Sequence, residues 1–451
     1  MAPGTELELR IDSLAYGGRG IARLDRFVLF VIGALPGDRV LARVEHVKRR
    51  HAEARTLRVL EPGPERVAPA CAHYPECGGC RLQDLAYPAQ ARLKEAQVRD
   101  ALARIAHVAQ PPLEPIVPAD EPYAYRNKLE YAFAQTRDGA SPGLHRAGRY
   151  DEVLPIERCW LTGDLGNAIR DAVRAWARAE RLIAHAAGTR EGYLRHLIVR
   201  EARSTGQALV LLVTSPGELP GREALVARLT RFPEIRSIQW AVNEGVSEVT
   251  SMPTTLLWGE PTIEERILGL RFKVGPSTFL QTNTAMVERL YALALEAAAL
   301  TPSEIAFDLY CGIGTISLAL ARGGRGVFGL ELAEESVERA RENAELNGID
   351  NVSFLAGDVG KHLDRLVQVA GETPSVVVVD PPRAGLAPKA LRRIAALSAP
   401  RLVYVSCNPT TLAGDAKTLI AEHSYRLVRA RPVDMFPQTP HVEAVALFER
   451  A

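Results

Sequence analysis

The chain has 451 residues, which is long for one domain and predicts two or three. Hydrophobic residues make up 47% and charged residues 24%, as in globular chains, and the net charge of +1 favours no class of partner. The N-terminus carries acidic residues early, and no apolar run is long enough to span a bilayer. We therefore expect a cytoplasmic monomer with no membrane partner, whose six cysteines are ligands, nucleophiles or buried residues.

The first segment, residues 1–61, shows the pattern of short strands. ELELRI (6–11) and DRVLARVEHV (38–47) alternate apolar and polar residues, and RFVLFVIG (26–33) is almost entirely apolar. Glycine-containing turns separate these runs. The segment is predicted to be a small antiparallel, OB-like β-barrel, a shape often used to hold nucleic acid.

Positive charge is concentrated in this segment. Its first 60 residues contain eleven Lys and Arg against seven Asp and Glu, a net charge of +4. Much of the excess lies between residues 42 and 58. The charge favours a phosphate-binding patch, with a merely solvated face as the alternative.

The middle segment, residues 62–273, is predicted to be a mixed α+β domain. It opens with a cysteine cluster and continues with a helical stretch at 89–106. LRHLIVREA (194–202) and QALVLLVTS (207–215) have the composition of strands.

The last segment, residues 274–451, has the pattern of an α/β, Rossmann-like domain. A helix is predicted over 285–300, and another from about Ala333 to the Asn347-Gly348 stop. Hydrophobic strands separated by helical stretches indicate a parallel, doubly wound sheet. The predicted strands cover residues 305–309, 326–331, 352–356, 375–380, 401–406, 425–432 and 443–448.

A nucleotide site is predicted where the first of these strands ends. Gly312 and Gly314 let the backbone turn tightly, and the following helix points its N-terminus at a ligand. Glu331 ends the next strand, where an acid accepts from ribose hydroxyls of NAD or S-adenosylmethionine alike. The dinucleotide fingerprint needs a third glycine where Ser317 stands, which counts against a dehydrogenase.

Three further residues are predicted to lie at the carboxyl edge of the sheet. Asp380 begins DPPR, whose prolines force a rigid exit from the strand. Cys407 ends a central strand just before a helix, where the helix dipole lowers a thiol pKa, so we interpret it as a nucleophile. Glu443 enters the last strand and is a candidate base.

The four cysteines outside this segment suggest a metal site. Cys71, Cys77 and Cys80 form a tight triplet, and Cys159 is the one distant partner. Four thiolates suit either an iron–sulfur cluster or zinc.

Several motifs resemble the RNA uracil-C5-methyltransferases, most closely the branch that modifies 23S ribosomal RNA. They are FLQTNT (279–284), DLYCGIGT (308–315), DPPRAGL (380–386), SCNPTTLAGD (406–415) and FPQTPHVE (436–443). The resemblance covers essentially the whole chain. It implies an N-terminal TRAM domain, S-adenosylmethionine as methyl donor, and RNA as partner, with 23S ribosomal RNA favoured and transfer RNA possible.

The resemblance also implies residue roles. Cys407 corresponds to the nucleophile and Glu443 to the base, and the four outlying cysteines would hold a [4Fe-4S] cluster. The S-adenosylmethionine contacts would be Gln281, Tyr310, Glu331, Asp358 and Asp380. Two other classes stay in view: an NAD-dependent oxidoreductase with an electron-transfer cluster, and a non-catalytic RNA-binding or ribosome-assembly protein.

Overall fold

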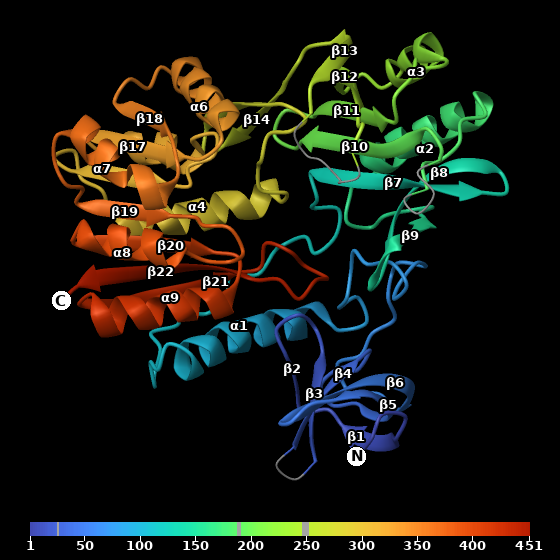
Figure 1. The fold of residues 1–451 in the computed structure, drawn as a ribbon, viewed down its shortest axis with the longest axis horizontal. Helices are drawn as coiled ribbons and strands as arrows, with labels where there is room; N and C mark the ends of the chain where they lie inside the picture. The colour runs from blue at the N-terminus through green and yellow to red at the C-terminus, as the bar shows by residue number, and fades with distance from the viewer. Residues whose placement is uncertain (25–26, 187–190, 246–251) are drawn as a thin grey trace.

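The computed structural model describes residues 1–24, 27–186, 191–245 and 252–451. Arg26, the first residue of one predicted strand, lies outside them. The chain forms an N-terminal barrel, a central sheet with its helices, and a C-terminal α/β body (Figure 1). No helix in the described ranges is long and apolar enough to cross a membrane.

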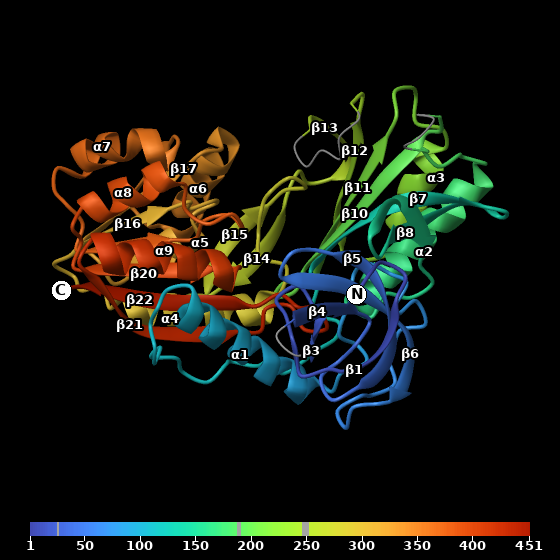
Figure 2. The same ribbon diagram turned by 60° about the horizontal axis from the view of Figure 1, so that its bottom comes forward.

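The N-terminal body is one strongly curved six-stranded sheet (Figure 2). Side chains alternate along its strands, so that Leu29, Val31 and Val40 are fully buried in its interior. The pairing is antiparallel except between β4 and β6, which run parallel, so the prediction of an all-antiparallel barrel was wrong at this pair. The basic stretch of residues 42–58 is part of this sheet, because it includes the end of β5 and most of β6. The strands are β1 (Glu6–Arg10), β2 (Ser13–Leu14), β3 (Gly20–Leu24), β4 (Phe27–Ile32), β5 (Arg39–Val47) and β6 (His51–Glu61).

The central body is a seven-stranded sheet with the order β13-β12-β11-β10-β7-β8-β9. Helix α2 (Asp164–Ala179) packs on this sheet, and α3 (Arg222–Leu229) packs on α2. The strands are β7 (Lys128–Thr136), β8 (Gly139–Arg146), β9 (Arg149–Pro155), β10 (Leu194–Ala202), β11 (Gln207–Thr214), β12 (Ile235–Val242) and β13 (Thr254–Gly259). A hairpin of β14 (Ile263–Ile267) and β15 (Leu270–Val274) shares a hydrophobic core with the C-terminal body.

The C-terminal body is a seven-stranded sheet with helices on both faces (Figure 1). Its order is β18-β17-β16-β19-β20-β22-β21. The strands are β16 (Ile305–Leu309), β17 (Gly326–Glu331), β18 (Val352–Ala356), β19 (Val376–Val379), β20 (Arg401–Ser406), β21 (Tyr425–Val433) and β22 (Glu443–Arg450). The helices are α4 (Thr284–Ala298), α5 (Thr315–Ala321), α6 (Glu334–Asn347), α7 (Val359–Ala370), α8 (Pro388–Ala396) and α9 (Pro409–Glu422).

One strand of this sheet departs from the prediction of a parallel sheet. β22 runs antiparallel to both β20 and β21. It does so because the short loop between β21 and β22 returns the chain directly, without a crossover helix. The first residue of β22 therefore lies at the edge where the parallel strands end.

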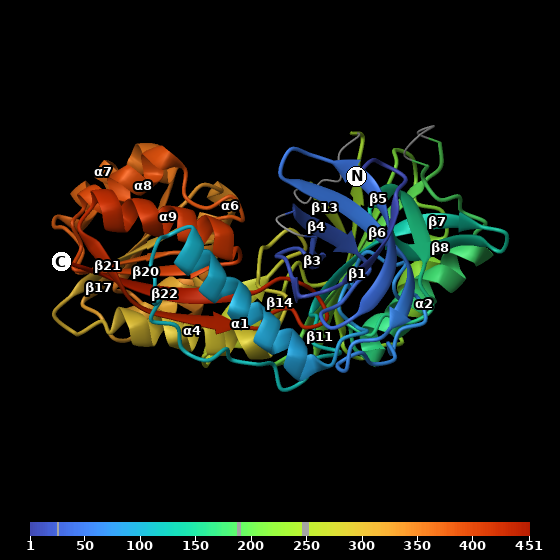
Figure 3. The same cartoon turned by 90° about the horizontal axis from the view of Figure 1, so that it is seen from below.

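Helix α1 (Tyr87–Arg104) connects the barrel side of the molecule to the C-terminal sheet. It packs against α9 and β21, and it crosses in front of the C-terminal sheet in Figure 3, where the molecule is seen from below. Its Lys94 Nζ lies 2.6 Å from Asp434 Oδ1 and donates to Phe436 O at 3.0 Å, with both charged side chains buried. Gln90 exchanges hydrogen bonds of 2.9 and 3.0 Å with Gln438. The 434–442 loop, which precedes Glu443, is therefore held by buried polar contacts rather than left open to solvent.

We expect Lys94→Ala to lower the free energy of unfolding by about 3–5 kcal/mol, because it leaves the Asp434 carboxylate buried without its cation. Urea-induced unfolding would measure the change. The matched control is Arg99→Ala, which removes a partly exposed ion pair to Glu95 on the same helix. An equal loss in both variants would contradict a special role for the buried pair, and Lys94→Met with Asp434→Leu should restore much of the stability.

Candidate active site

The glycine turn after β16 encloses a small cavity at the carboxyl edge of the sheet. Gly312 and Gly314 have φ values of +53° and +82°, and a Cβ on Gly314 would lie 2.9 Å from the Phe354 ring. Glycine is therefore required at Gly314 by both conformation and space. Tyr310, Gly312 and Asp380 line the cavity, whose volume is about 30 Å³.

Glu331, at the end of β17, closes the turn from the neighbouring strand. Its carboxylate accepts from the Gly312 amide at 3.1 Å and from the Ala333 amide at 2.9 Å. A fixed carboxylate beside a glycine turn is the arrangement that receives ribose hydroxyls. Glu331 therefore lies where a nucleoside-containing cofactor would be held.

The other two predicted cofactor residues flank this turn. Asp358 precedes α7, and its charge raises the pKa of Tyr310, although burial is the larger cause of that shift to about 12. Gln281 is buried, and its backbone carbonyl accepts from the Asn127 side chain at 3.0 Å. This bond ties the segment that carries Gln281 to the central body. Neither Gln281 nor Asp358 lines the small cavity itself.

Two carboxyls, Asp308 and Asp380, line the cavity, and sequence reasoning named only Asp380. Burial raises the pKa of Asp380 to about 7, and the charge of Asp308 adds to the shift. Burial likewise raises the pKa of Asp308 to about 7, although Ser317 donates to its carboxylate at 2.5 Å. Asp308 opens the same DLYCGIGT motif, so its place before the glycine turn was the available signal.

We expect Glu331→Ala to weaken binding of S-adenosylhomocysteine by about 1–3 kcal/mol, because it removes an acceptor and leaves two backbone amides unpaired. Isothermal titration calorimetry would measure the affinity. Glu334→Ala, an exposed acid in the first turn of α6, is the matched control and should bind like the wild type. Unchanged affinity in the Glu331 variant would contradict this placement of the cofactor.

Cys407 lies between β20 and α9. The next residue, Asn408, caps α9 by accepting from the Thr410 amide at 3.0 Å. The Asn408 side chain also donates to Arg383 O at 3.0 Å, which holds the DPPR loop beside the cysteine. The thiol is partly exposed and therefore accessible to a substrate.

Glu443 lies beside Cys407 because of the antiparallel strand. Ser406 pairs with Ala444 across β20 and β22, so the residues that follow and precede this pair are neighbours at the sheet edge. Glu443 is buried, and its Oε2 has no hydrogen-bond partner among the described residues. A buried carboxylate oxygen without a partner is typical of a group that awaits a ligand or a proton.

The electrostatics of Cys407 differ from the expectation of a lowered pKa. The pKa of the thiol is raised to about 11, with burial as the largest cause and the charges of Glu443 and Asp380 as further causes. Arg383, the last residue of DPPR, acts in the opposite direction. The helix-dipole argument was wrong for the free protein, because two carboxylates and desolvation outweigh the dipole.

Glu443 is perturbed for the same reasons. Burial raises its pKa to about 8, and the charge of Asp380 adds to the effect, while Arg383 lowers it. Sequence reasoning did not single out Arg383, although it stands in the motif. The available signal was its position, because Arg383 is the cation that ends DPPR, the motif already predicted to place Asp380 at the sheet edge.

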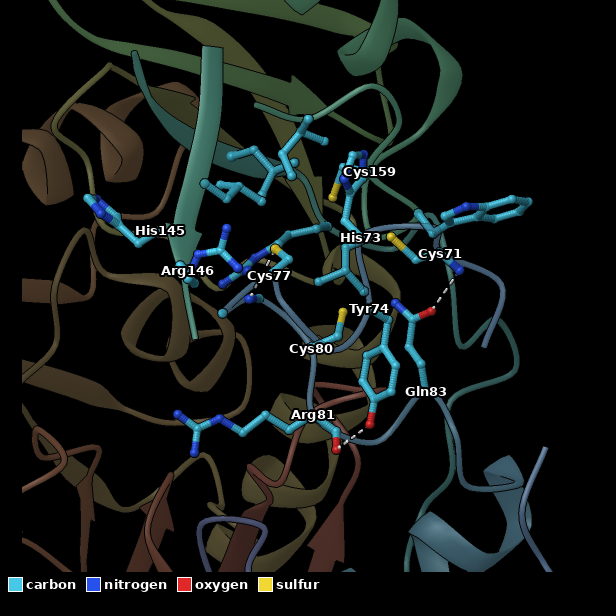
Figure 4. A pocket seen from close by; sticks show the side chains of 18 of the residues that line it. Cys71, His73, Tyr74, Cys77, Cys80, Arg81, Gln83, His145, Arg146 and Cys159 are labelled. Atoms are coloured by element: carbon cyan, nitrogen blue, oxygen red, sulfur yellow. Dashed lines mark hydrogen bonds between the residues drawn. The ribbon is translucent and has the colours of Figure 1, made fainter. Parts of the chain in front are cut away.

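The four outlying cysteines gather around one large cavity on the central body. Cys71, Cys77, Cys80 and Cys159 all line this cavity of about 600 Å³ (Figure 4). Among the described residues, however, no group of three or more His, Cys, Asp and Glu side chains has the arrangement that holds a metal ion. The structure thus shows a shared cavity and not the convergence on one metal position that the sequence led us to expect.

The local contacts nevertheless suit a sulfur-ligated group. The Gly79 amide donates to Cys77 Sγ at 3.4 Å, the kind of N–H···S bond that surrounds cluster thiolates. Asn167 accepts from the Cys159 amide at 2.8 Å and donates to its carbonyl at 3.0 Å, which positions that cysteine.

The loop that carries Cys71, Cys77 and Cys80 also contacts the 434–442 loop, which leads to Glu443. The amides of Arg81 and Leu82, directly after Cys80, donate to Gln438 O at 2.9 and 3.1 Å. Gln438 belongs to the loop before Glu443. The cavity and the Cys407 site are thus joined by one short run of backbone.

Comparison with known proteins decides the family. The family model described as tRNA (uracil-5-)-methyltransferase matches residues 261–451, and the model of the TRAM domain matches residues 2–57. A protein of Porphyromonas gingivalis named as an uncharacterized RNA methyltransferase is 39% identical, covering 98% of this chain and 99% of its own. The chain belongs to the RNA (uracil-C5)-methyltransferase family. The oxidoreductase and the non-catalytic alternatives are therefore set aside.

Other relatives agree with this family membership. A protein of Halalkalibacterium halodurans with the same description is 36% identical, covering 98% of this chain and 96% of its own. The crystal structure of Pyrococcus abyssi tRNA (uracil-54, C5)-methyltransferase in complex with S-adenosyl-L-homocysteine has a TM-score of 0.78 and 29% identity. The match covers 98% of this chain and 100% of that one. The N-terminal TRAM domain and the C-terminal methyltransferase fold are thus confirmed, and S-adenosylmethionine is the methyl donor of this methyltransferase.

Proposed function

We propose that this enzyme methylates carbon 5 of a uridine through a covalent bond between Cys407 and carbon 6 of the uracil. The observation that carries the proposal is the juxtaposition of Cys407 and Glu443 across β20 and β22, beside the cavity formed by the glycine turn. One thiol and one carboxylate, whose Oε2 has no hydrogen-bond partner in the described part of the chain, supply at a single sheet edge the two groups that the chemistry needs.

The steps follow from the chemistry of uracil. Carbon 5 is a poor nucleophile until a thiolate adds to carbon 6 and places an enolate on the ring. The Cys407 thiol gives its proton to water, assisted by the positive charge of Arg383, and its sulfur then bonds to carbon 6. Carbon 5 next attacks the methyl group of S-adenosylmethionine, and S-adenosylhomocysteine leaves.

Glu443 completes the cycle. Its carboxylate removes the proton from carbon 5, the electron pair of that C–H bond forms the double bond between carbons 5 and 6, and the bond from carbon 6 to sulfur breaks to release the Cys407 thiolate. The burial that raises the Glu443 pKa also makes its carboxylate a stronger base than an exposed one. The uridine must leave its base stack to reach these residues.

For the substrate, we propose 23S ribosomal RNA, on the strength of the motifs that resemble that branch of the family. The competing substrate is transfer RNA, since the Pyrococcus abyssi relative carries that description. The TRAM barrel would bind RNA phosphates. Arg49, Arg50 and Arg58 are its exposed candidates, because several of its other cations are already paired with acids.

The test for the substrate uses RNA from a strain that lacks the gene. Purified enzyme and S-adenosylmethionine with a tritiated methyl group are incubated with separated 23S ribosomal RNA and transfer RNA. We expect 5-methyluridine at one position of the ribosomal RNA. Label in transfer RNA alone would reverse the substrate assignment but leave the chemistry intact, whereas label in neither RNA would refute the proposed activity.

We further propose that Cys71, Cys77, Cys80 and Cys159 hold a [4Fe-4S] cluster. Four thiols around one cavity of about 600 Å³, with an N–H···S bond already present, are the supporting observations. The cluster would organise the loop that contacts Gln438, and so would act on the site through structure.

We expect protein purified without oxygen to be brown and to contain iron and sulfide, and Cys159→Ala to lose most of both, because one of four ligands is gone. Elemental analysis and the visible absorption spectrum would measure this. The control is Cys311→Ala, which removes a buried cysteine far along the chain. This variant should contain as much iron as the wild type. Stoichiometric zinc without iron in the wild type would overturn the cluster assignment.

A further inference from the structure

A loop of the N-terminal barrel reaches the catalytic cysteine. Tyr16 lies between β2 and β3, and its hydroxyl donates to the backbone carbonyl of Cys407 at 3.3 Å. This contact joins residues 391 positions apart in the chain. The half-buried phenol is also close enough to Cys407 and Glu443 for their charges to raise its pKa, after burial as the larger cause, while Arg383 lowers it.

Neighbouring contacts hold this loop in place. A Cβ on Gly18 would lie 3.4 Å from the Pro440 side chain, so the loop packs against the segment that leads to Glu443. Arg81 donates to Gly17 O at 3.3 Å, and Gln97 on α1 donates to the carbonyls of Leu14 and Ala15 at 3.4 Å. The barrel is thus docked at the site by several independent contacts.

We propose that Tyr16 forms a wall of the uridine pocket and stacks its ring on the base that is turned out of the RNA. The proposal rests on the proposed function and extends it, because it gives the barrel a direct part in presenting the base. Phosphate binding by the barrel does not require an aromatic side chain next to Cys407, whereas base stacking does.

The ring, and not the hydroxyl, is expected to contribute most. A hydrogen bond of 3.3 Å is longer than the usual O–H···O distance of roughly 2.7–2.8 Å, so the hydroxyl chiefly orients the side chain. A planar aromatic face instead offers stacking to any base, and such stacking changes affinity by about 5- to 150-fold when removed.

The first test compares wild type, Tyr16→Phe and Tyr16→Ala, with Leu57→Ala as an exposed control on the same barrel. Each is mixed with transcripts of 23S ribosomal RNA and of transfer RNA that contain 5-fluorouridine, which traps the covalent adduct. We expect adduct formation to slow about 5- to 150-fold in Tyr16→Ala and to change little in Tyr16→Phe and Leu57→Ala. Affinity for S-adenosylhomocysteine and the melting temperature should be unchanged in all four proteins. Equal rates in Tyr16→Ala and wild type would overturn the inference, and so would a Tyr16→Phe rate as low as that of Tyr16→Ala.

The second test does not depend on covalent catalysis. A photoreactive p-azidophenylalanine at position 16 is irradiated with unmodified RNA, and the crosslinked nucleotide is mapped. Crosslinks at the methylated uridine or its neighbour would support the inference, and crosslinks only to distant nucleotides or none at all would refute it. If wild type traps no fluorinated RNA, the covalent mechanism fails, while the crosslink still decides whether Tyr16 meets the base.

Discussion

Cys407→Ala is expected to lower the rate of methyl transfer by roughly 10⁴- to 10⁶-fold, the range for removal of a catalytic nucleophile. Without the sulfur, no bond forms at carbon 6, and carbon 5 never becomes nucleophilic enough to attack a methyl group. The measurement is single-turnover transfer of tritiated methyl groups to RNA. The side chain lies at the strand end and is partly exposed, so we expect the fold to survive the substitution.

The control for this variant is cofactor binding. Cys407→Ala should bind S-adenosylhomocysteine as the wild type does, because the thiol does not line the cavity formed by the glycine turn. RNA containing 5-fluorouridine should form a complex with wild type that survives denaturing electrophoresis, since fluorine cannot leave as a cation. The alanine variant should form none. Methylation at a normal rate by Cys407→Ala would show that another group is the nucleophile.

Glu443→Gln is expected to stop the reaction at a later step and to slow turnover by about 10²- to 10⁴-fold, the usual contribution of a general base. Addition and methyl transfer still occur, but no carboxylate removes the proton from carbon 5. The protein should therefore remain bonded to methylated RNA. Denaturing electrophoresis with a labelled methyl group would detect this complex.

Glu449→Gln, at the other end of the same strand, is the matched control. Its carboxylate pairs with Arg426 at the surface, and its loss should leave turnover unchanged. A Glu443 variant that is slow but accumulates no adduct would place the carboxylate before addition and would contradict its role as the final base.

The same carboxylate should determine the pH dependence of wild type. Its pKa in the folded protein is raised to about 8, so Glu443 is largely protonated and inactive as a base below that pH. We expect the rate at which methylated RNA is released from the covalent adduct to rise as the pH increases through about 8. The limb due to Glu443 should be absent in Glu443→Gln, and Asp380→Asn should shift it to lower pH by removing a neighbouring negative charge.

Much of the C-terminal fold could be predicted from local sequence. Six of its strands, β16, β17, β18, β20, β21 and β22, begin at the predicted residues, and Gly348 ends α6 in a left-handed conformation as the Asn-Gly pair indicated. These features depend on hydrophobic runs and glycine conformations, which act over a few residues. Strand β6 was not predicted, because the charges of the basic stretch concealed its alternation of buried and more exposed residues.

The sequence by itself also determined which residues we propose for the chemistry, since the thiol, the carboxylates and the glycine turn stand in specific motifs. Only the tertiary structure decided how they meet. The reversed β22 places Glu443 beside Cys407, and this choice of strand direction depends on a return loop packed on α1 through Lys94 and Gln90. The pKa of Cys407 and the approach of Tyr16 were equally hidden, because burial and contacts across hundreds of residues arise only when the barrel, the central sheet and the catalytic sheet pack together.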